Sequence, residues 1–265
     1  MSRIAGCFTA AAADDRAVFI PYVTAGDPRI ERTAELVLAL VRAGADLIEL
    51  GVPFSDPVAD GPTNQRAAER ALQHGTSLAD VLATVRLVRQ KSNVPIVLFT
   101  YCNPVLQYGI EAFADEATSS GIDGVLFTDV PVEEIERFRP RLTASGLDPI
   151  MLVTPTSGKA RIKRASRAGA GFLYLVSRTG VTGAQNRLDP KLEKLIAEVR
   201  KISKLPVAVG FGISDADQVR QVASWADGVV VGSAIVNRVA AIGDDDGLSS
   251  AIEDFVRPLV AACRR

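Results

Sequence analysis

Eight short apolar runs, spread along the whole chain, constrain its fold more than any other feature of the sequence. Most of them are continuously apolar and do not alternate with polar residues, which is typical of parallel strands that are covered on both faces. The runs are AVFIPYV (17–23), DLIELGV (46–52), PIVLFTY (95–101), GVLFTD (124–129), PIMLV (149–153), FLYLVS (172–177), PVAVGF (206–211) and GVVVGS (228–233). The pattern predicts eight parallel β-strands.

Amphipathic helical patterns occupy many of the gaps between these runs. Ser77, with Asp80 three residues later, predicts the start of one helix, and Gly44 predicts the end of another. The predicted helices span 30–44, 77–91, 132–146, 188–202, 214–224 and about 248–262. Alternation of strand and helix around eight strands predicts a single (β/α)₈ TIM barrel, and we expect residues 1–265 to form one domain.

A doubly wound open sheet is the alternative architecture. It is disfavoured because YVTAGDP, and no G-x-G-x-x-G motif, follows the first strand. The segment before that strand holds Ala10–Ala13 followed by two aspartates, which indicates an extra N-terminal helix. Only three apolar or small residues separate Arg3 from Cys7, too few for the ~7–15 apolar residues of an export signal.

Composition excludes several classes of function. The 265 residues are 48% hydrophobic and 23% charged with a net charge of -1, so no basic surplus exists to bind nucleic acid. The three cysteines are far apart and form no CxxC pair, which favours a reducing cytoplasm. No apolar run approaches the ~20 residues of a membrane span. The single histidine, His74, cannot build a multi-histidine metal site, and we expect no metal.

Glycine, proline and polar residues concentrate where the predicted strands end. The segments are TAGDP, PFSDPVADGP, YCNP, DVPVEE, SRTGVTGAQ, GFGIS and GSAIV. Active sites of TIM barrels are built from the loops at this end of the strands. The concentration of these residues at this end, and not at the other, therefore predicts an enzyme. In GFGIS and GSAIV, glycine closes a strand just before an expected helix start, where exposed amides bind anions, and the glycines of TGVTGA (179–184) add a third set of amides from a mobile loop. We expect a phosphate-monoester site there.

Glu49 lies inside the second predicted strand, in IELG. Alternation places Ile48 and Leu50 on one face and Glu49 on the other, so Glu49 faces the barrel mouth if its neighbours pack against helices. A carboxylate there is either a general acid–base with a raised pKa or a structural residue bonded to backbone or serine. Asp60, in a loop stiffened by prolines, is the natural second carboxylate; Asp56 before Pro57 is also a common turn starter.

Together these motifs resemble the α subunit family of tryptophan synthase. FIPYVTAGDP, IELGVPFSDPVADGP, DVPVEE, YLVSRTGVTGA, VGFGIS and VGSAIV fall in the family's order between about residues 19 and 236. The resemblance implies a cofactor-free retro-aldol lyase that splits indole-3-glycerol phosphate into indole and glyceraldehyde 3-phosphate. It also implies an α2β2 assembly in which indole passes to a β subunit that carries pyridoxal phosphate, with the segment around Pro53–Asp56 and the YCNP segment meeting that subunit.

The resemblance assigns the site residue by residue. Glu49 and Asp60 match the catalytic pair, with Glu49 moving protons and Asp60 holding the indole N–H. The expected substrate-binding residues are Tyr22, Phe99, Tyr101, Asp129, Tyr174 and Thr182, and the expected phosphate-binding residues are Gly183, Phe211, Gly212, Gly232 and Ser233. RTGVTGA matches a loop that closes over substrate and brings Thr182 to Asp60. Two positions depart from the family: Tyr22 stands where phenylalanine is frequent, and Asn64 stands where a branched apolar residue is usual.

Other functions remain open from the sequence. A free-standing lyase that releases indole is the alternative to a subunit with a β partner. A binding-only scaffold is disfavoured by the presence of both Glu49 and Asp60. Another phosphate-handling barrel, such as a sugar-phosphate isomerase, fits the carboxylate pair and the aromatic residues less well than a flat heteroaromatic substrate does.

Overall fold

The computed structural model describes residues 2–176, 191–210 and 212–265, and in them eight parallel strands form a closed barrel. Each strand pairs with its neighbour in the sequence, and β1 pairs with β8 to close the cylinder. The strands are β1 (Val18–Thr24), β2 (Ile48–Gly51), β3 (Ile96–Thr100), β4 (Gly124–Phe127), β5 (Asp148–Val153), β6 (Leu173–Val176), β7 (Val207–Gly210) and β8 (Gly228–Val231). The predicted TIM barrel and all eight predicted strands are confirmed.

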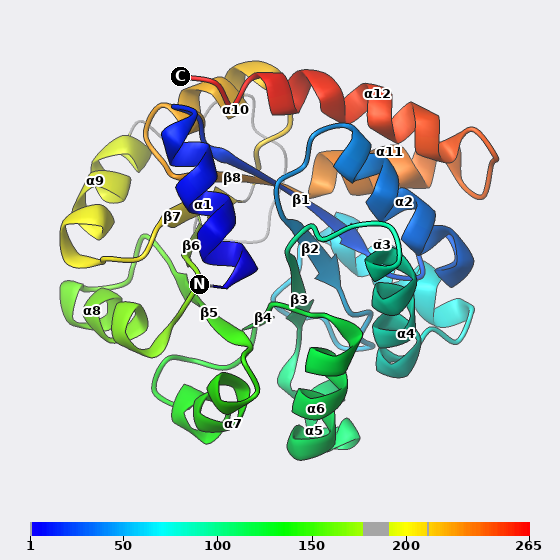
Figure 1. The fold of residues 1–265 in the computed structure, drawn as a ribbon, viewed down its shortest axis with the longest axis horizontal. Helices are drawn as coiled ribbons and strands as arrows, with labels where there is room; N and C mark the ends of the chain where they lie inside the picture. Colours follow the sequence, from blue (N-terminus) through cyan, green and yellow to red (C-terminus); the bar gives the residue numbers. More distant parts are fainter. Residues whose placement is uncertain (1, 177–190, 211) are drawn as a thin grey trace.

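Helices surround the barrel, and one helix lies across its end (Figure 1). The helices in the described residues are α1 (Arg3–Ala13), α2 (Ile30–Arg42), α3 (Pro62–Gln73), α4 (Leu78–Arg89), α5 (Cys102–Tyr108), α6 (Ile110–Ser120), the short 3₁₀ helix η1 (Ile135–Arg137), α7 (Arg139–Ala144), α8 (Lys159–Ala168), α9 (Leu192–Ile202), α10 (Ala216–Ala223), α11 (Ser233–Ile242) and α12 (Leu248–Ala261). None of them combines the length and apolarity that crossing a bilayer requires.

The predicted helices 30–44, 77–91, 214–224 and 248–262 are present as α2, α4, α10 and α12, and the predicted helix 188–202 is present as α9, with residues 188–190 outside the described ranges. The segment predicted as one helix over 132–146 is split into η1 and α7, with Pro140 at the start of α7, where its missing N–H is tolerated. The YCNP segment, expected as a loop, enters α5 at Cys102. The N-terminal helix is present as α1, and Ser77 with Asp80 forms the predicted cap of α4, with both reciprocal hydrogen bonds.

Alternate residues of each strand pack on opposite sides of the barrel wall. Ile48 and Leu50 belong to the outer core between strands and helices. Leu47 and the other inward-facing residues form a separate core inside the cylinder. The face of β2 that carries Glu49 therefore points into the barrel, as the alternation predicted.

Helix α1 closes the end of the barrel where the strands begin. Ile4 and Phe8 are part of the interior core, and Phe8 packs against Phe172 with ring centroids 5.5 Å apart. Glycines at two strand starts leave room for these side chains. A Cβ at Gly124 would lie 3.1 Å from Ile4, and a Cβ at Gly228 would lie 3.2 Å from Phe8. The interior of the cylinder is thus sealed at this end, so a site inside the barrel opens at the carboxyl ends of the strands.

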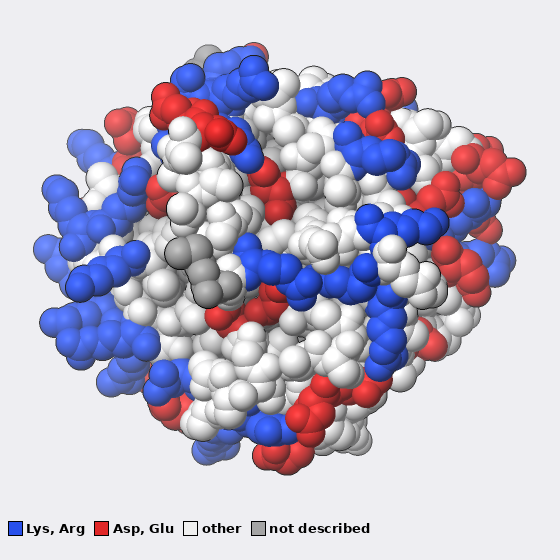
Figure 2. Space-filling view, viewed as in Figure 1, with Lys and Arg blue, Asp and Glu red and all other residues white. Residues whose placement is uncertain are grey.

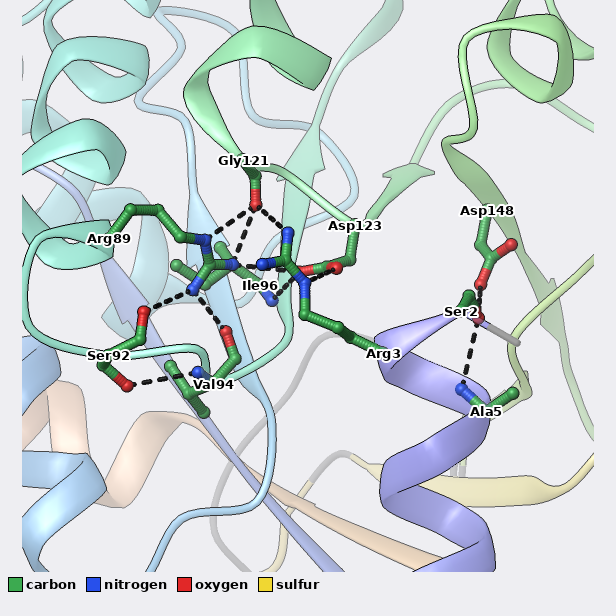
Figure 3. A network of polar contacts seen from close by, with 10 residues as sticks. All are labelled: Ser2, Arg3, Ala5, Arg89, Ser92, Val94, Ile96, Gly121, Asp123 and Asp148. Atoms are coloured by element: carbon green, nitrogen blue, oxygen red, sulfur yellow. Dashed lines mark hydrogen bonds and ion pairs between the residues drawn. The ribbon is translucent and has the colours of Figure 1, made fainter.

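A buried carboxylate, Asp123, ties three segments together beside α1 (Figure 3). Its Oδ2 accepts hydrogen bonds from the Ile96 amide at 2.8 Å and from Arg89 Nη2 at 2.9 Å, and its Oδ1 accepts from Arg3 Nε at 2.6 Å. Arg89 also donates to the backbone carbonyls of Gly121 and Val94. Burial lowers the pKa of Arg89 to about 10, so this guanidinium depends on Asp123 for compensation.

We predict that Asp123→Ala lowers the free energy of unfolding by ~3–5 kcal/mol, because it leaves the buried charge of Arg89 without a counter-charge and the Ile96 amide without an acceptor. Arg3→Ala is the matched control, since that side chain is 40% exposed and its ion pair is worth ~0–1 kcal/mol. Urea unfolding followed by circular dichroism measures both. Equal losses in the two variants would contradict the anchoring role of Asp123.

Candidate active site

Glu49 lies in the middle of β2 and is 1% exposed. In the barrel register it is beside Tyr22 of β1 and Val97 of β3. Neither carboxylate oxygen has a hydrogen-bond partner among the described residues. The alternative of a structural glutamate bonded to backbone or serine therefore finds no support in this part of the chain.

Burial raises the pKa of Glu49 to about 8. Removal of the charged form from water, uncompensated by a cation, is the cause. A carboxyl group with this pKa holds a proton at neutral pH and releases it at little cost. Glu49 is thus suited to both general acid and general base catalysis.

Asp60 ends the loop between β2 and α3 and is 7% exposed. Its Oδ2 accepts a hydrogen bond from the Tyr101 hydroxyl at 2.9 Å, and that hydroxyl accepts one from the Ala59 amide at 3.0 Å. Gln65, in the first turn of α3, donates from Nε2 to the Asp60 carbonyl at 2.9 Å. The carboxylate and the backbone of Asp60 are therefore both held in place.

The pKa of Asp60 is raised by burial, while hydrogen bonds from Tyr101 and Asn64 act in the opposite direction. Asn64, the position that departs from the family, thus contributes an amide to Asp60 instead of apolar surface. Its Oδ1 is buried with no partner among the described residues. Asp60 is the more readily ionised of the two carboxyl groups, because only Asp60 has these donors.

Tyr22 and Tyr174 are buried inside the barrel near both carboxylates. Burial raises the pKa of both phenols well above the ordinary value, and the negative charges of Asp60 and Glu49 act in the same direction on each. Tyr22 packs edge-on against Phe99 with centroids 5.2 Å apart, and its hydroxyl lies 3.2 Å from Thr24 Oγ1. The Tyr22 hydroxyl, which a phenylalanine would lack, therefore has a partner inside the pocket.

Glycines at two strand ends create the space for these tyrosines. A Cβ at Gly51 would lie 2.2 Å from the Tyr22 hydroxyl, and a Cβ at Gly210 would lie 2.1 Å from that of Tyr174. Any side chain at either position would displace a ring. Gly51, Gly210 and Gln65 are site residues that the sequence reasoning missed, although Gly51 shares the face of Glu49 two residues earlier.

Two of the expected phosphate-binding glycines, Gly212 and Gly232, follow β7 and β8 and so lie on the same rim. Gly232 directly precedes Ser233, the first residue of α11. The free backbone amides at the start of this helix therefore lie at the mouth of the barrel. A Cβ at Gly232 would contact the Tyr22 side chain at 3.4 Å, which places this turn beside the aromatic pocket. Gly212 has φ +80°, a conformation that favours glycine. Thr182, Gly183 and Phe211 lie outside the described residues.

Asp129 and Asp56 are placed differently from the central pair. Asp129 is exposed, and its Oδ1 accepts a hydrogen bond from the Cys102 amide at the start of α5. Asp56 is exposed and accepts a hydrogen bond from the Ser55 hydroxyl.

Across the ranges that the structure describes, no group of three or more His, Cys, Asp or Glu side chains is placed to hold a metal ion.

Comparisons with known proteins agree on one family. The family described as "Tryptophan synthase alpha chain" matches residues 8–261. The tryptophan synthase alpha chain of Solibacter usitatus is 49% identical over 98% of this chain and 97% of its own length. That of Synechococcus elongatus is 51% identical over 90% of each. Among solved structures, tryptophan synthase of Mycobacterium tuberculosis has a TM-score of 0.91 and 35% identity, with 100% of this chain and 99% of that chain covered.

We predict that Glu49→Gln stabilises the fold at pH 8. Between pH 4.5 and about 8 the unfolded chain loses the Glu49 proton while the folded chain keeps it, so stability falls as pH rises. At ~1.4 kcal/mol per pKa unit, the variant gains as much as ~4 kcal/mol at pH 8 and almost nothing near pH 4.5. Urea unfolding at both pH values measures the gain, and Glu193→Gln on exposed α9 is the control. A gain that does not depend on pH would contradict the pKa of Glu49.

Proposed function

The chain belongs to the tryptophan synthase alpha chain family, and from that premise we propose that Glu49 and Asp60 carry the proton transfers of its reaction. The chain is a lyase that acts on indole-3-glycerol phosphate. It is itself cofactor-free, because pyridoxal phosphate is on the β subunit with which the alpha chain partners. The alternative of a free-standing lyase is not favoured.

The observation that carries the catalytic proposal is the contrast between the two carboxyl groups. Glu49 has no hydrogen-bond partner among the described residues and a pKa near 8, whereas Asp60 accepts from a phenol and an amide. Different surroundings give the two carboxyl groups different pKa values, and this difference assigns their roles. Glu49 exchanges protons, and Asp60 stays charged.

The chemistry requires these two roles. Cleavage of the bond between the indole ring and the glycerol carbon needs a proton on C3 of the ring and removal of the proton from the adjacent hydroxyl. Glu49 takes the hydroxyl proton and supplies the proton at C3. Asp60 accepts the indole N–H and stabilises the positive charge that develops on the ring when C3 is protonated. No external oxidant or reductant is needed.

The rest of the rim binds the substrate in the same proposal. Tyr22, Phe99 and Tyr174 enclose the planar ring, and their apolar surface excludes water from Glu49. Gly212, Gly232 and Ser233 present amides to the phosphate, together with Gly183 and Phe211. Tyr101 acts on Asp60 through its hydrogen bond, and Asp129, Thr182 and the loop that carries Thr182 complete the substrate contacts.

Two exposed apolar side chains support the predicted contact region for the β subunit. Val58, in the loop that ends at Asp60, is 79% exposed, and Leu106, on α5, is 55% exposed. Single exposed apolar side chains are common on protein surfaces, so the support comes from where these two lie, on or next to the segments that the resemblance assigns to the β subunit. We propose that the β subunit contacts these two segments and thereby reaches the loop that carries Asp60.

We further propose that residues 1–265 form one domain located in the cytoplasm. The barrel closes through pairing of β1 with β8, and Arg16 forms an isolated bridge with Arg264, which supports a single folding unit. Cys7, Cys102 and Cys263 are free thiols, as is usual in a reducing compartment.

We predict that Glu49→Gln lowers kcat for release of indole by at least ~10²- to 10⁴-fold, because the amide cannot exchange protons. Indole release in the presence of the β subunit is followed spectroscopically, and binding of glycerol 3-phosphate checks that the phosphate site is intact. Glu193→Gln, at an exposed carboxylate outside the proposed set of site residues, should leave kcat unchanged. Wild-type turnover in Glu49→Gln would refute the acid–base role.

Tyr101→Phe should lower kcat/KM by ~10- to 100-fold, since a hydrogen bond to a charged group is worth ~1.5–3 kcal/mol. Loss of this donor raises the pKa of Asp60 further, so the acidic limb of the kcat/KM profile should move to higher pH. Tyr108→Phe, at the end of α5, is the matched control. An unshifted acidic limb would show that Tyr101 does not hold Asp60 in its ionised form.

A further inference from the structure

A second cavity lies at the opposite end of the barrel from Glu49. Its volume is about 670 Å³, within the range of small-molecule sites. One wall is α1, and the other is formed by the end of α9 and the segments that lead into β7 and β8. The proposed catalytic residues are at the far end of the strands and take no part in it.

Four cations line this cavity, and two of them form no ion pair in the described part of the chain. Arg16 pairs with Asp46 at 2.7 Å, and Arg200 pairs with Asp227 at 3.0 Å. Arg265 and Lys204 also line the cavity, and neither lies within ion-pair distance of a described carboxylate. The cavity therefore has a surplus of positive charge.

Arg265 is the better positioned of the two surplus cations. Its Nε donates to the Ala223 carbonyl at 2.8 Å and its Nη2 to the Ala226 carbonyl at 2.7 Å. These bonds fix the plane of the guanidinium and use two of its five N–H groups. The remaining donors form a preorganised fork of the kind that binds carboxylate or phosphate.

The cavity also has an apolar wall. Phe8 lines it from α1 and is itself held by its contact with Phe172. Leu205 and Pro206 line it from the opposite side. A ligand that satisfies both parts of this cavity has an anionic group and a flat apolar body.

The surrounding surface is positively charged as well. Lys and Arg side chains gather on the flank formed by α8 and α9 (Figure 2). On α8 the sequence KARIKRASRA contains no acidic residue, and its cations are exposed. This flank continues to Arg200 and Lys204 at the cavity, so its field raises the local concentration of small anions there.

We propose that this cavity binds a small organic anion that carries an aromatic or similarly flat apolar group, with Arg265 and Lys204 contacting the anion and Phe8 contacting the ring. The ligand class is an aromatic carboxylate or an aryl phosphomonoester, which share this chemistry. The site is separate from the phosphate-binding glycines, which lie at the carboxyl ends of the strands.

Phenylacetate, its neutral amide phenylacetamide, and phenyl phosphate test the proposal on the full chain. Titrations followed by amide chemical shifts, with glycerol 3-phosphate saturating the catalytic end, should show saturable changes at Thr9, Gly171 and Leu205. Phenylacetamide should bind at least tenfold more weakly than phenylacetate. Tighter binding of phenylacetate than of phenyl phosphate assigns carboxylates, and the reverse assigns phosphomonoesters; either result supports the site.

Variants locate the contacts. Arg265→Met should raise Kd at least tenfold and Lys204→Met about threefold, while Lys201→Met, on exposed α9 outside the cavity, should change Kd less than twofold. Ala12→Trp, which fills the cavity without altering charge, should abolish binding and leave indole release unchanged. Equal affinity for phenylacetamide, unchanged affinity in Arg265→Met, or shifts confined to the carboxyl ends of the strands would overturn the proposal.

Discussion

Burial of one carboxyl group without a compensating charge is the constraint on which the site depends. Glu49 holds its proton near neutral pH because the closed barrel removes it from water on every side. That burial follows from the alternation of β2, in which Ile48 and Leu50 must face the helices. The packing of two ordinary aliphatic residues outside the barrel therefore sets the proton affinity of the acid inside it.

The two ends of the barrel have different roles: packing and hydrogen bonds at one end stabilise the fold, and the proposed catalytic groups lie at the other. Where the strands begin, α1 fills the cylinder and Asp123 satisfies two guanidinium groups and a backbone amide. Where they end, polar atoms of Glu49 and Asn64 are left without partners among the described residues. Unsatisfied buried groups cost stability, so the bonds made by Asp123 help to offset the cost of leaving Glu49 without partners in the described ranges.

The sequence was sufficient to predict the barrel, because each buried parallel strand appears as a continuous apolar run. It was also sufficient to orient Glu49, since a period of two is a local property. Helices α3, α5, α6 and α8 were not predicted. In α3 most residues are small or polar, and α8 is mostly basic, so neither shows a strong apolar stripe. The hydrogen bond from Tyr101 to Asp60 connects residues that are 41 positions apart in the sequence. The space that Gly51 leaves for Tyr22 depends on two neighbouring strands. Such contacts exist only after the barrel closes.

The close approach of Tyr22 to Gly51 couples the substitutions that these two positions can accept during evolution. A tyrosine hydroxyl occupies the volume that any larger residue at 51 would need. Two ring carbons of Tyr22 would also lie 2.7 and 2.9 Å from a Cβ at 51, so a lineage that keeps an aromatic ring at 22 accepts no substitution at 51 unless that ring moves. The same epistasis ties Tyr174 to Gly210. The order in which mutations arise at the rim is thus restricted by geometry as well as by catalysis.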